Sequence, residues 1–145
     1  MDLFDLALIK KYDQSGPRYT SYPTANNFSA FTQTQYEQQV ALSNNRQGPI
    51  SLYCHIPFCD TVCFYCGCNK VVTKDKTKAE VYLQALFKEI DMQSALFDKT
   101  RQVDQMHFGG GTPTFLSDEQ IIRLSEKLQS AFKFADNGEY SIEID

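Results

Sequence analysis

From residue 50 onward, hydrophobic and polar positions follow a pattern that predicts three strands. Residues 50–56 form a short, mostly apolar run that predicts the first strand, which Pro57 ends. Residues 103–108 predict the second strand, and a run of three glycines, 109–111, closes it. In residues 140–145 apolar and polar side chains alternate, and this period of two predicts the third strand.

The segments between these strands have the spacing of helices. Thr77 with Glu80 has the spacing of a capping box, in which two side chains satisfy free amides at a helix N-terminus. Ser117 with Gln120 has the same spacing. Apolar residues follow each box at helical intervals. They are Val81, Leu83, Leu86, Phe87 and Ile90 after the first box, and Ile121, Leu124, Leu128 and Phe132 after the second.

The N-terminal third of the chain has a weaker pattern. Residues 2–12 predict a short helix, residues 13–30 a long irregular segment, and residues 33–45 a polar helix. We therefore expect two parts. Residues 1–48 would form an N-terminal extension that could contact a substrate, and residues 49–145 the first part of a barrel domain.

The order strand, helix, strand, helix, strand predicts an α/β fold with a parallel sheet and crossover helices. Three parallel strands cannot close a barrel, so we expect a partial (β/α) barrel that is the front portion of a longer protein. Loops at the carboxyl ends of parallel strands meet at one edge of the sheet. The loop with the cysteines, the glycine run and Glu143 are all expected there.

Composition narrows the class of protein. Hydrophobic residues make up 42% of the chain and charged residues 22%, as in ordinary globular proteins. The formal charge of -4 disfavours general binding to nucleic acid or to anionic membranes. No apolar run approaches the roughly 20 residues of a membrane span, and the N-terminus has acids where a secretory signal has cations. We expect a cytoplasmic monomer.

The five cysteines all lie between Cys54 and Cys68. A disulfide framework would spread its cysteines over the chain, whereas thiols gathered in one loop are typical of metal ligands. Cys59, Cys63 and Cys66 could hold an iron–sulfur cluster with one iron open to a reactant. With Cys68 as a fourth ligand, the same loop could hold structural zinc. Cys54 is expected to be a small buried hydrophobic residue.

Residues 59–66 resemble the C-x3-C-x-aromatic-C motif of the radical S-adenosylmethionine enzymes, with Tyr65 at the aromatic position. Further segments resemble one branch, the oxygen-independent coproporphyrinogen III oxidase family. They are residues 16–25, 53–59, 66–70, 109–114 and 141–145. The resemblance covers nearly the whole chain from about residue 11 onward.

The resemblance implies roles for individual residues. Cys59, Cys63 and Cys66 would bind a four-iron, four-sulfur (4Fe-4S) cluster, and S-adenosylmethionine would chelate the open iron. The implied contacts to S-adenosylmethionine are Tyr53, Tyr65, Gly110, Gly111, Thr112 and Glu143. Thr112 stands where the superfamily usually has an acid after two glycines, which leaves the partner of the cofactor's amine open.

Each of these residues also has a plainer interpretation. Tyr53 could be a core residue and Tyr65 a loop residue that packs locally, the glycines could form a bare turn, and Glu143 could be a solvated carboxylate. The catalytic residue is unknown. The candidates are His55, Cys68 and Arg18, although a histidine at a strand end often has a structural role and Arg18 could be a surface residue.

The activity that the resemblance implies is oxidative decarboxylation. Two propionate side chains of coproporphyrinogen III would become vinyl groups of protoporphyrinogen IX, with two molecules of S-adenosylmethionine consumed. An unidentified electron donor and acceptor would take part. Two alternatives stay open: a related haem chaperone of the same superfamily, and a zinc-binding structural module.

Overall fold

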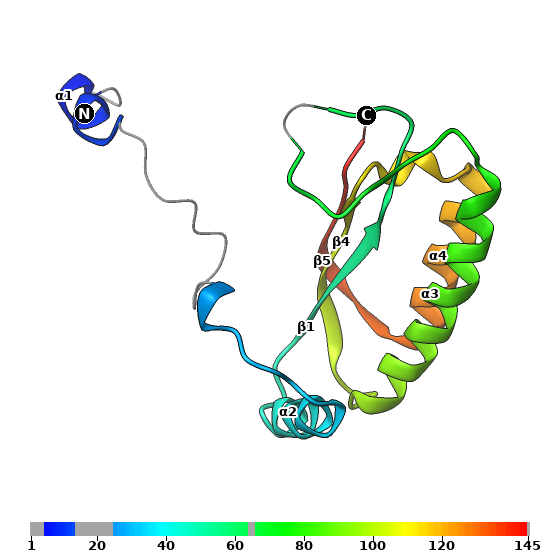
Figure 1. The fold of residues 1–145 in the computed structure, drawn as a ribbon. Helices are drawn as coiled ribbons and strands as arrows, with labels where there is room; N and C mark the ends of the chain where they lie inside the picture. Colours follow the sequence, from blue (N-terminus) through cyan, green and yellow to red (C-terminus); the bar gives the residue numbers. More distant parts are fainter. Residues whose placement is uncertain (1–4, 14–24, 64–65, 145) are drawn as a thin grey trace. The chain divides into compact units, whose positions relative to one another are not determined.

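The structure of the chain is a computed structural model (Figure 1). The described residues are 5–13, 25–63 and 66–144. Contacts divide the chain into two units, residues 1–32 and 33–145, each of which is described here by itself. The predictions for Arg18 and Tyr65 lie outside the described residues.

The first unit holds one short helix, α1 (Leu6–Tyr12), and a single 3-10 turn at Ala25–Asn27 among its described residues. The side chain of Asp5 accepts hydrogen bonds from the amides of Ala7 and Leu8, at 2.9 and 3.0 Å. These are two of the amides that a helix leaves free at its start. The N-cap at Asp5 therefore sets the start of the predicted helix at Leu6.

The second unit is built on a parallel sheet with the strand order β1-β4-β5. Its strands are β1 (Ile50–Ile56), β4 (Gln102–Gly110) and β5 (Lys133–Ile142). Two helices, α3 (Thr77–Leu96) and α4 (Asp118–Ala131), cover one face of this sheet (Figure 1). The predicted α/β fold with three parallel strands in an open sheet is confirmed.

The core lies between the sheet and the two helices. Ile56 and Leu83 have no exposed surface, and Leu124 and Leu128 are nearly as buried. Burying one such side chain stabilises the fold by roughly 1.5–3 kcal/mol. Because side chains alternate along a strand, β1 points Leu52, Cys54 and Ile56 toward the helices, and Tyr53 and His55 toward the opposite face.

Helix α2 (Gln33–Asn45) belongs to the second unit, whereas we expected a boundary after residue 48. Hydrogen bonds attach it to the segment between α3 and β4. Asn44 donates to the carbonyl of Leu96 at 2.8 Å and accepts from the amide of Asp98 at 3.1 Å. The guanidinium of Arg101 donates to Ser43 Oγ at 3.1 Å. The bounds of α2 agree with the predicted helix.

The two predicted capping boxes have different outcomes. The box at Ser117 and Gln120 is present: each side chain accepts from the other's backbone amide, at 3.3 and 3.1 Å. The box at Thr77 is wrong, because Thr77 already lies within α3. The N-cap is Lys76, which makes no side-chain capping bond, and Asp75, one residue earlier, accepts from both the amide and the hydroxyl of Thr77 at 3.0 and 2.6 Å.

Strand β5 is longer than predicted, because it begins at Lys133 and not near Tyr140. Phe132, expected to be the last apolar residue of the preceding helix, is the C-cap of α4. The pairing of β5 with β4 shifts register between Val103 and Gln105, so four residues of β5, 135–138, lie between two paired stretches. This irregularity hides the strand's period of two from the sequence pattern.

Glu80, the other member of the rejected box, forms an ion pair between the two helices. Arg123 donates to both carboxylate oxygens at 2.9 Å, and Gln120 adds a bond at 3.3 Å. These bonds hold the pKa of the Glu80 carboxyl below its ordinary value. The stability that they contribute is present above the ordinary glutamate pKa and is lost as pH falls through the lowered one.

We expect Arg123→Gln to raise the pKa of Glu80 toward its ordinary value, because the bidentate bond is lost. Carboxyl carbon chemical shifts, followed by NMR during an acid titration, measure this change. Lys127→Gln is the matched control, since Lys127 pairs with Asp91 across the same two helices. An unchanged Glu80 pKa in Arg123→Gln would show that the ion pair does not exist in solution.

Candidate cofactor-binding site

The cysteine loop follows β1, and its two ends are tied together by a short parallel pair that we did not predict. The pair joins β2 (Phe58–Cys59) to β3 (Val71–Val72). The amide of Val71 donates to the carbonyl of Pro57 at 2.6 Å, and that of Thr73 to the carbonyl of Cys59 at 2.9 Å. Two-residue strands are too short to show a period, so sequence pattern alone could not reveal them.

A pocket of about 420 Å³ lies at the end of the sheet that carries this loop. It is lined by Cys59, Thr61, Cys63, Cys66, Gly67, Cys68, Gly110, Gly111, Thr112, Glu143 and Ile144. The three predicted ligands, the glycine run after β4 and the acid after β5 thus share one space. The prediction that these features meet at one edge of the sheet is confirmed.

The described thiols have unequal environments. Hydrogen bonds from Lys70 and the backbone lower the pKa of the Cys66 thiol, which favours the thiolate that binds metals. Lys70 Nζ also donates to the carbonyl of Cys66 at 3.4 Å. Burial, together with the nearby Cys66, raises the pKa of Cys68. Cys68, which we did not assign as a cluster ligand, is therefore harder to ionise than Cys66.

The donor set fits a body larger than one ion. Among the described residues, no three Cys, His, Asp or Glu side chains converge tightly enough to hold a single metal ion. The cysteines instead line a broad pocket. A 4Fe-4S cluster needs its thiolates spread out, because each binds a different iron. Three thiolates around one pocket are the donor set that a 4Fe-4S cluster with one open iron takes.

The glycines of β4 leave no room for side chains beside the cysteine loop. A Cβ on Gly111 would lie 2.6 Å from the carbonyl oxygen of Phe58 and 2.9 Å from Cys59 Sγ. Gly110 has a φ of +120°, which only glycine adopts without strain. Its Cβ would lie 2.7 Å from His55 Nδ1. Close approach between β4 and the loop thus requires glycine at both positions.

The amides of this run are already paired within the protein. Gly110 N–H donates to Glu143 Oε2 at 3.1 Å, Gly111 N–H to the carbonyl of Ile56 at 2.8 Å, and Thr112 N–H to that of Phe58 at 2.8 Å. All three amides therefore have partners within the protein. The Thr112 hydroxyl donates to Cys59 Sγ at 3.8 Å, so it contacts the cysteine loop directly.

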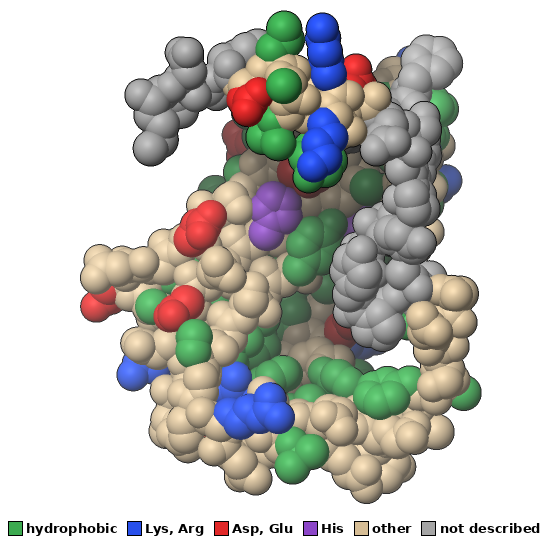
Figure 2. Space-filling model, turned by 90° about the vertical axis from the view of Figure 1, so that its left-hand side faces the viewer, with side chains coloured by type: hydrophobic (Ala, Val, Ile, Leu, Met, Phe, Trp, Pro, Cys, Tyr) green, Lys and Arg blue, Asp and Glu red, His purple; other side chains and the backbone are tan. Residues whose placement is uncertain are grey.

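Tyr53 lies on the face of the sheet that α3 and α4 leave uncovered. Figure 2 shows that face, with histidine side chains (purple) among hydrophobic ones (green). The tyrosine is 58% exposed, so the alternative of a core residue is wrong. Burial of its hydroxyl and the negative charge of Glu143 raise its pKa.

His55 has both ring nitrogens engaged. Nε2 lies 2.8 Å from the carbonyl oxygen of Asn69, and Nδ1 lies 3.3 Å from the Tyr53 hydroxyl. Asn69 is part of the cysteine loop, so this histidine links β1 to that loop. A catalytic role for His55 stays a prediction, as it does for Cys68.

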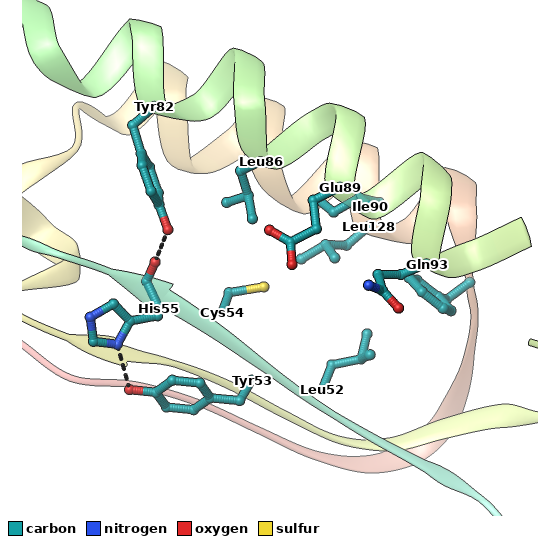
Figure 3. Close-up of a pocket in the computed structure, with 11 residues that line it drawn as sticks. Leu52, Tyr53, Cys54, His55, Tyr82, Leu86, Glu89, Ile90, Gln93 and Leu128 are labelled. Carbon is teal, nitrogen blue, oxygen red and sulfur yellow. Dashed lines mark hydrogen bonds between the residues drawn. The ribbon is translucent and has the colours of Figure 1, made fainter. Parts of the chain in front are cut away.

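Cys54 occupies a different pocket, between β1 and α3 (Figure 3). This space of about 200 Å³ is mostly apolar, and the Cys54 sulfur points into it together with the Glu89 carboxylate. Burial and the charge of Glu89 raise the pKa of the Cys54 thiol to about 11. Only 6% of Cys54 is exposed, which confirms it as a small buried residue.

Comparison with known proteins identifies the family. Over 143 residues the chain is 52% identical to the oxygen-independent coproporphyrinogen III oxidase of Escherichia coli, covering 98% of the chain and 31% of that relative. It is 48% identical over 144 residues to the protein of the same name from Mannheimia haemolytica, covering 99% of the chain and 97% of that relative. The chain belongs to the oxygen-independent coproporphyrinogen III oxidase family.

A solved structure agrees with this membership. The coproporphyrinogen III oxidase (HemN) from Escherichia coli, a radical SAM enzyme, superimposes with a TM-score of 0.82 at 49% identity, covering 98% of the chain and 31% of that protein. The chain thus spans about a third of the length of this family member. No protein-family model matches the chain. In its described part, no helix is long and apolar enough to cross a membrane.

Some residues of the site were not singled out by any sequence motif. Lys70 donates to the carbonyl of Cys66, and the carbonyl of Asn69 lies against His55 Nε2. The hydroxyl of Ser141 lies against His107 Nδ1. His107 lies in the second predicted strand, where a histidine often has a structural role. Its position level with Tyr53 in the sheet register is the signal that could have singled it out.

Proposed function

We propose that this chain forms the cofactor-binding part of an oxygen-independent coproporphyrinogen III oxidase. The observation that carries the proposal is the pocket in which three cysteines, a glycine run and Glu143 meet. Membership of the family and the fold of HemN support it.

In this proposal, Cys59, Cys63 and Cys66 hold a 4Fe-4S cluster. Five residues are proposed to surround S-adenosylmethionine: Gly110, Gly111, Thr112 and Glu143, which line the same pocket, and Tyr53 on the uncovered face of the sheet. Tyr65, between two of the cysteines, is proposed as a further contact on its position in the sequence alone. When bound, the cluster would supply an electron to S-adenosylmethionine. The cofactor would in turn supply the alkyl radical that removes hydrogen from a propionate side chain.

The chain's own residues would bind and orient S-adenosylmethionine. The carboxylate of Glu143 is 53% exposed and lines the pocket, so its oxygens can accept hydrogen bonds from ribose hydroxyls. The closely packed glycines let the cysteine loop lie against the end of β4, so that the proposed cluster ligand Cys59 and the pocket residue Glu143 share one space.

The proposed substrate is coproporphyrinogen III, and two molecules of S-adenosylmethionine would serve its two propionates. An electron must enter and an electron must leave for each decarboxylation, so we propose that a separate donor and acceptor take part. Residues 1–48 are proposed as the extension that precedes the barrel domain.

The experiment that tests this function uses the intact protein, purified and loaded without oxygen. We expect iron and sulfide in equal amounts, 5′-deoxyadenosine from S-adenosylmethionine, and two carbon dioxide molecules per porphyrin when coproporphyrinogen III and a reductant are present. Stoichiometric zinc without sulfide would overturn the radical chemistry. Cofactor cleavage with intact coproporphyrinogen III would instead indicate another substrate or a haem-handling role.

A further inference from the structure

One row of side chains crosses all three strands on the uncovered face of the sheet. Tyr53 on β1 is level with His107 on β4, and His107 is level with Ser141 on β5. The Tyr53 and His107 rings stack with centroids 5.7 Å apart and planes at 22°. His107 Nδ1 lies 2.8 Å from Ser141 Oγ, and its Nε2 lies 3.4 Å from Glu143 Oε1.

The chemistry of these partners assigns the protons. A carboxylate only accepts hydrogen bonds, so His107 Nε2 must carry the hydrogen that faces Glu143. In a neutral ring Nδ1 is then an acceptor, and the Ser141 hydroxyl is the group that can donate to it. Ser141 therefore selects the tautomer of His107 that can donate to Glu143.

Two donors from the middle strand hold the two oxygens of Glu143. His107 donates to Oε1, and Gly110 N–H donates to Oε2 at 3.1 Å. A carboxylate oxygen can accept two hydrogen bonds, so each oxygen keeps one position for a further donor. Glu143 lines the cysteine pocket and is about half exposed. A pair of neighbouring hydroxyls on a ligand matches these two remaining positions.

Gly109 makes space for this arrangement. A Cβ on Gly109 would lie 2.9 Å from His107 Nε2 and 3.0 Å from a ring carbon of Tyr53. The first distance is shorter than real Cβ contacts and the second is tighter than nearly all of them, so a side chain there would displace the stacked rings. The first glycine of the run thus has a different purpose from Gly110 and Gly111, which lie against β1 and the cysteine loop.

We propose that His107 is a positioning residue, set by Ser141 and stacked on Tyr53, that fixes the Glu143 carboxylate to receive the two ribose hydroxyls of S-adenosylmethionine. The inference rests on the proposed function and deepens it. It assigns His107 and Ser141 to the hold on the ribose, without direct contact between either residue and the ligand.

The test measures how tightly two ligands bind to three variants of the intact, cluster-loaded protein. The ligands are S-adenosylmethionine and its 2′,3′-dideoxyribose analogue, and equilibrium binding without reductant is measured. We expect His107→Phe, which keeps a ring to stack on Tyr53, to weaken S-adenosylmethionine binding about tenfold. Binding of the dideoxy analogue should be unchanged. His107→Gln, which keeps a donor near Nε2, should restore most of the loss, and Ser141→Ala should lie between.

The outcomes separate the two levels of inference. Equal weakening of both ligands in His107→Phe would make His107 a structural residue only, and so would failure of His107→Gln to rescue. Unchanged binding in all three variants would overturn the positioning role while leaving the proposed function intact. If the unaltered protein binds neither ligand, the proposed function itself fails.

Histidine ring nitrogen shifts give a readout that needs no ligand. We expect nitrogen NMR of the unaltered protein to place the hydrogen of the uncharged His107 ring on Nε2, and Ser141→Ala to mix the two tautomers. A His107 ring with its hydrogen on Nδ1 would contradict the assignment.

Discussion

Replacing Cys59 with alanine is expected to abolish the cluster while the fold persists. Cys59 lies in β2 with 8% of its surface exposed, and its sulfur packs against the glycine run. The Thr112 hydroxyl donates to this sulfur, so the thiol is held at a set position in the pocket. Loss of a partner in a second shell already lowers metal binding 10- to 100-fold, and loss of a ligand must do at least as much. Bound iron and sulfide should therefore fall by more than about tenfold.

Cys54→Ala is the matched control for this prediction. Cys54 is also buried, but its sulfur points away from the cysteine loop, toward α3 (Figure 3). We expect Cys54→Ala to keep full iron and sulfide content and Cys68→Ala to keep most of it. Visible absorption and metal analysis of anaerobically loaded protein measure both. A colourless Cys54→Ala beside a brown Cys59→Ala would refute the ligand assignment.

Gly111→Ala is expected to have the second largest effect on the site and on stability. The added Cβ would meet two groups of the cysteine loop that are held in place. One is the carbonyl oxygen of Phe58, at 2.6 Å, which already accepts the amide of Thr112. The other is Cys59 Sγ, at 2.9 Å. Relief of these contacts requires the cysteine loop to move away from β4. We expect a loss of about 1–3 kcal/mol in the free energy of unfolding, the usual cost of overpacking.

The same displacement should also lower the cluster content of Gly111→Ala, since it moves a proposed ligand. Urea unfolding measures the stability, and iron analysis the cluster. Gly67→Ala is the control within the cysteine loop, because a Cβ there meets nothing within 4 Å. Wild-type stability and iron content in Gly111→Ala would show that the loop does not lie against β4 in this way.

Element positions were predictable where one local pattern determined them. Strand β1 and helix α2 have the expected bounds because a proline or a run of polar residues interrupts the pattern beside them. The start of α3 was misjudged because its N-cap is Lys76, which has no capping side chain, while Asp75 before it binds the amide of Thr77. The start of β5 was missed because its pairing with β4 is interrupted.

The site was predictable to a similar extent. Spacing and resemblance together proposed Cys59, Cys63 and Cys66 as one group, and the structure places them around one pocket. They could not reveal that Glu143 already binds the amide of Gly110, nor that His107 lies beside it. These contacts join β4 to β5 across more than 30 residues of sequence.

The sequence by itself determined the alternation of strands and helices, the metal-binding character of the cysteine loop and the family to which the chain is similar. Each of these follows from residues close together in the chain, where period and spacing act directly. Only the tertiary structure decided which side chains share a row across the sheet and which groups pair with the amides of the glycine run. Strand order and register set those neighbours, and they depend on the packing of the whole sheet against its helices.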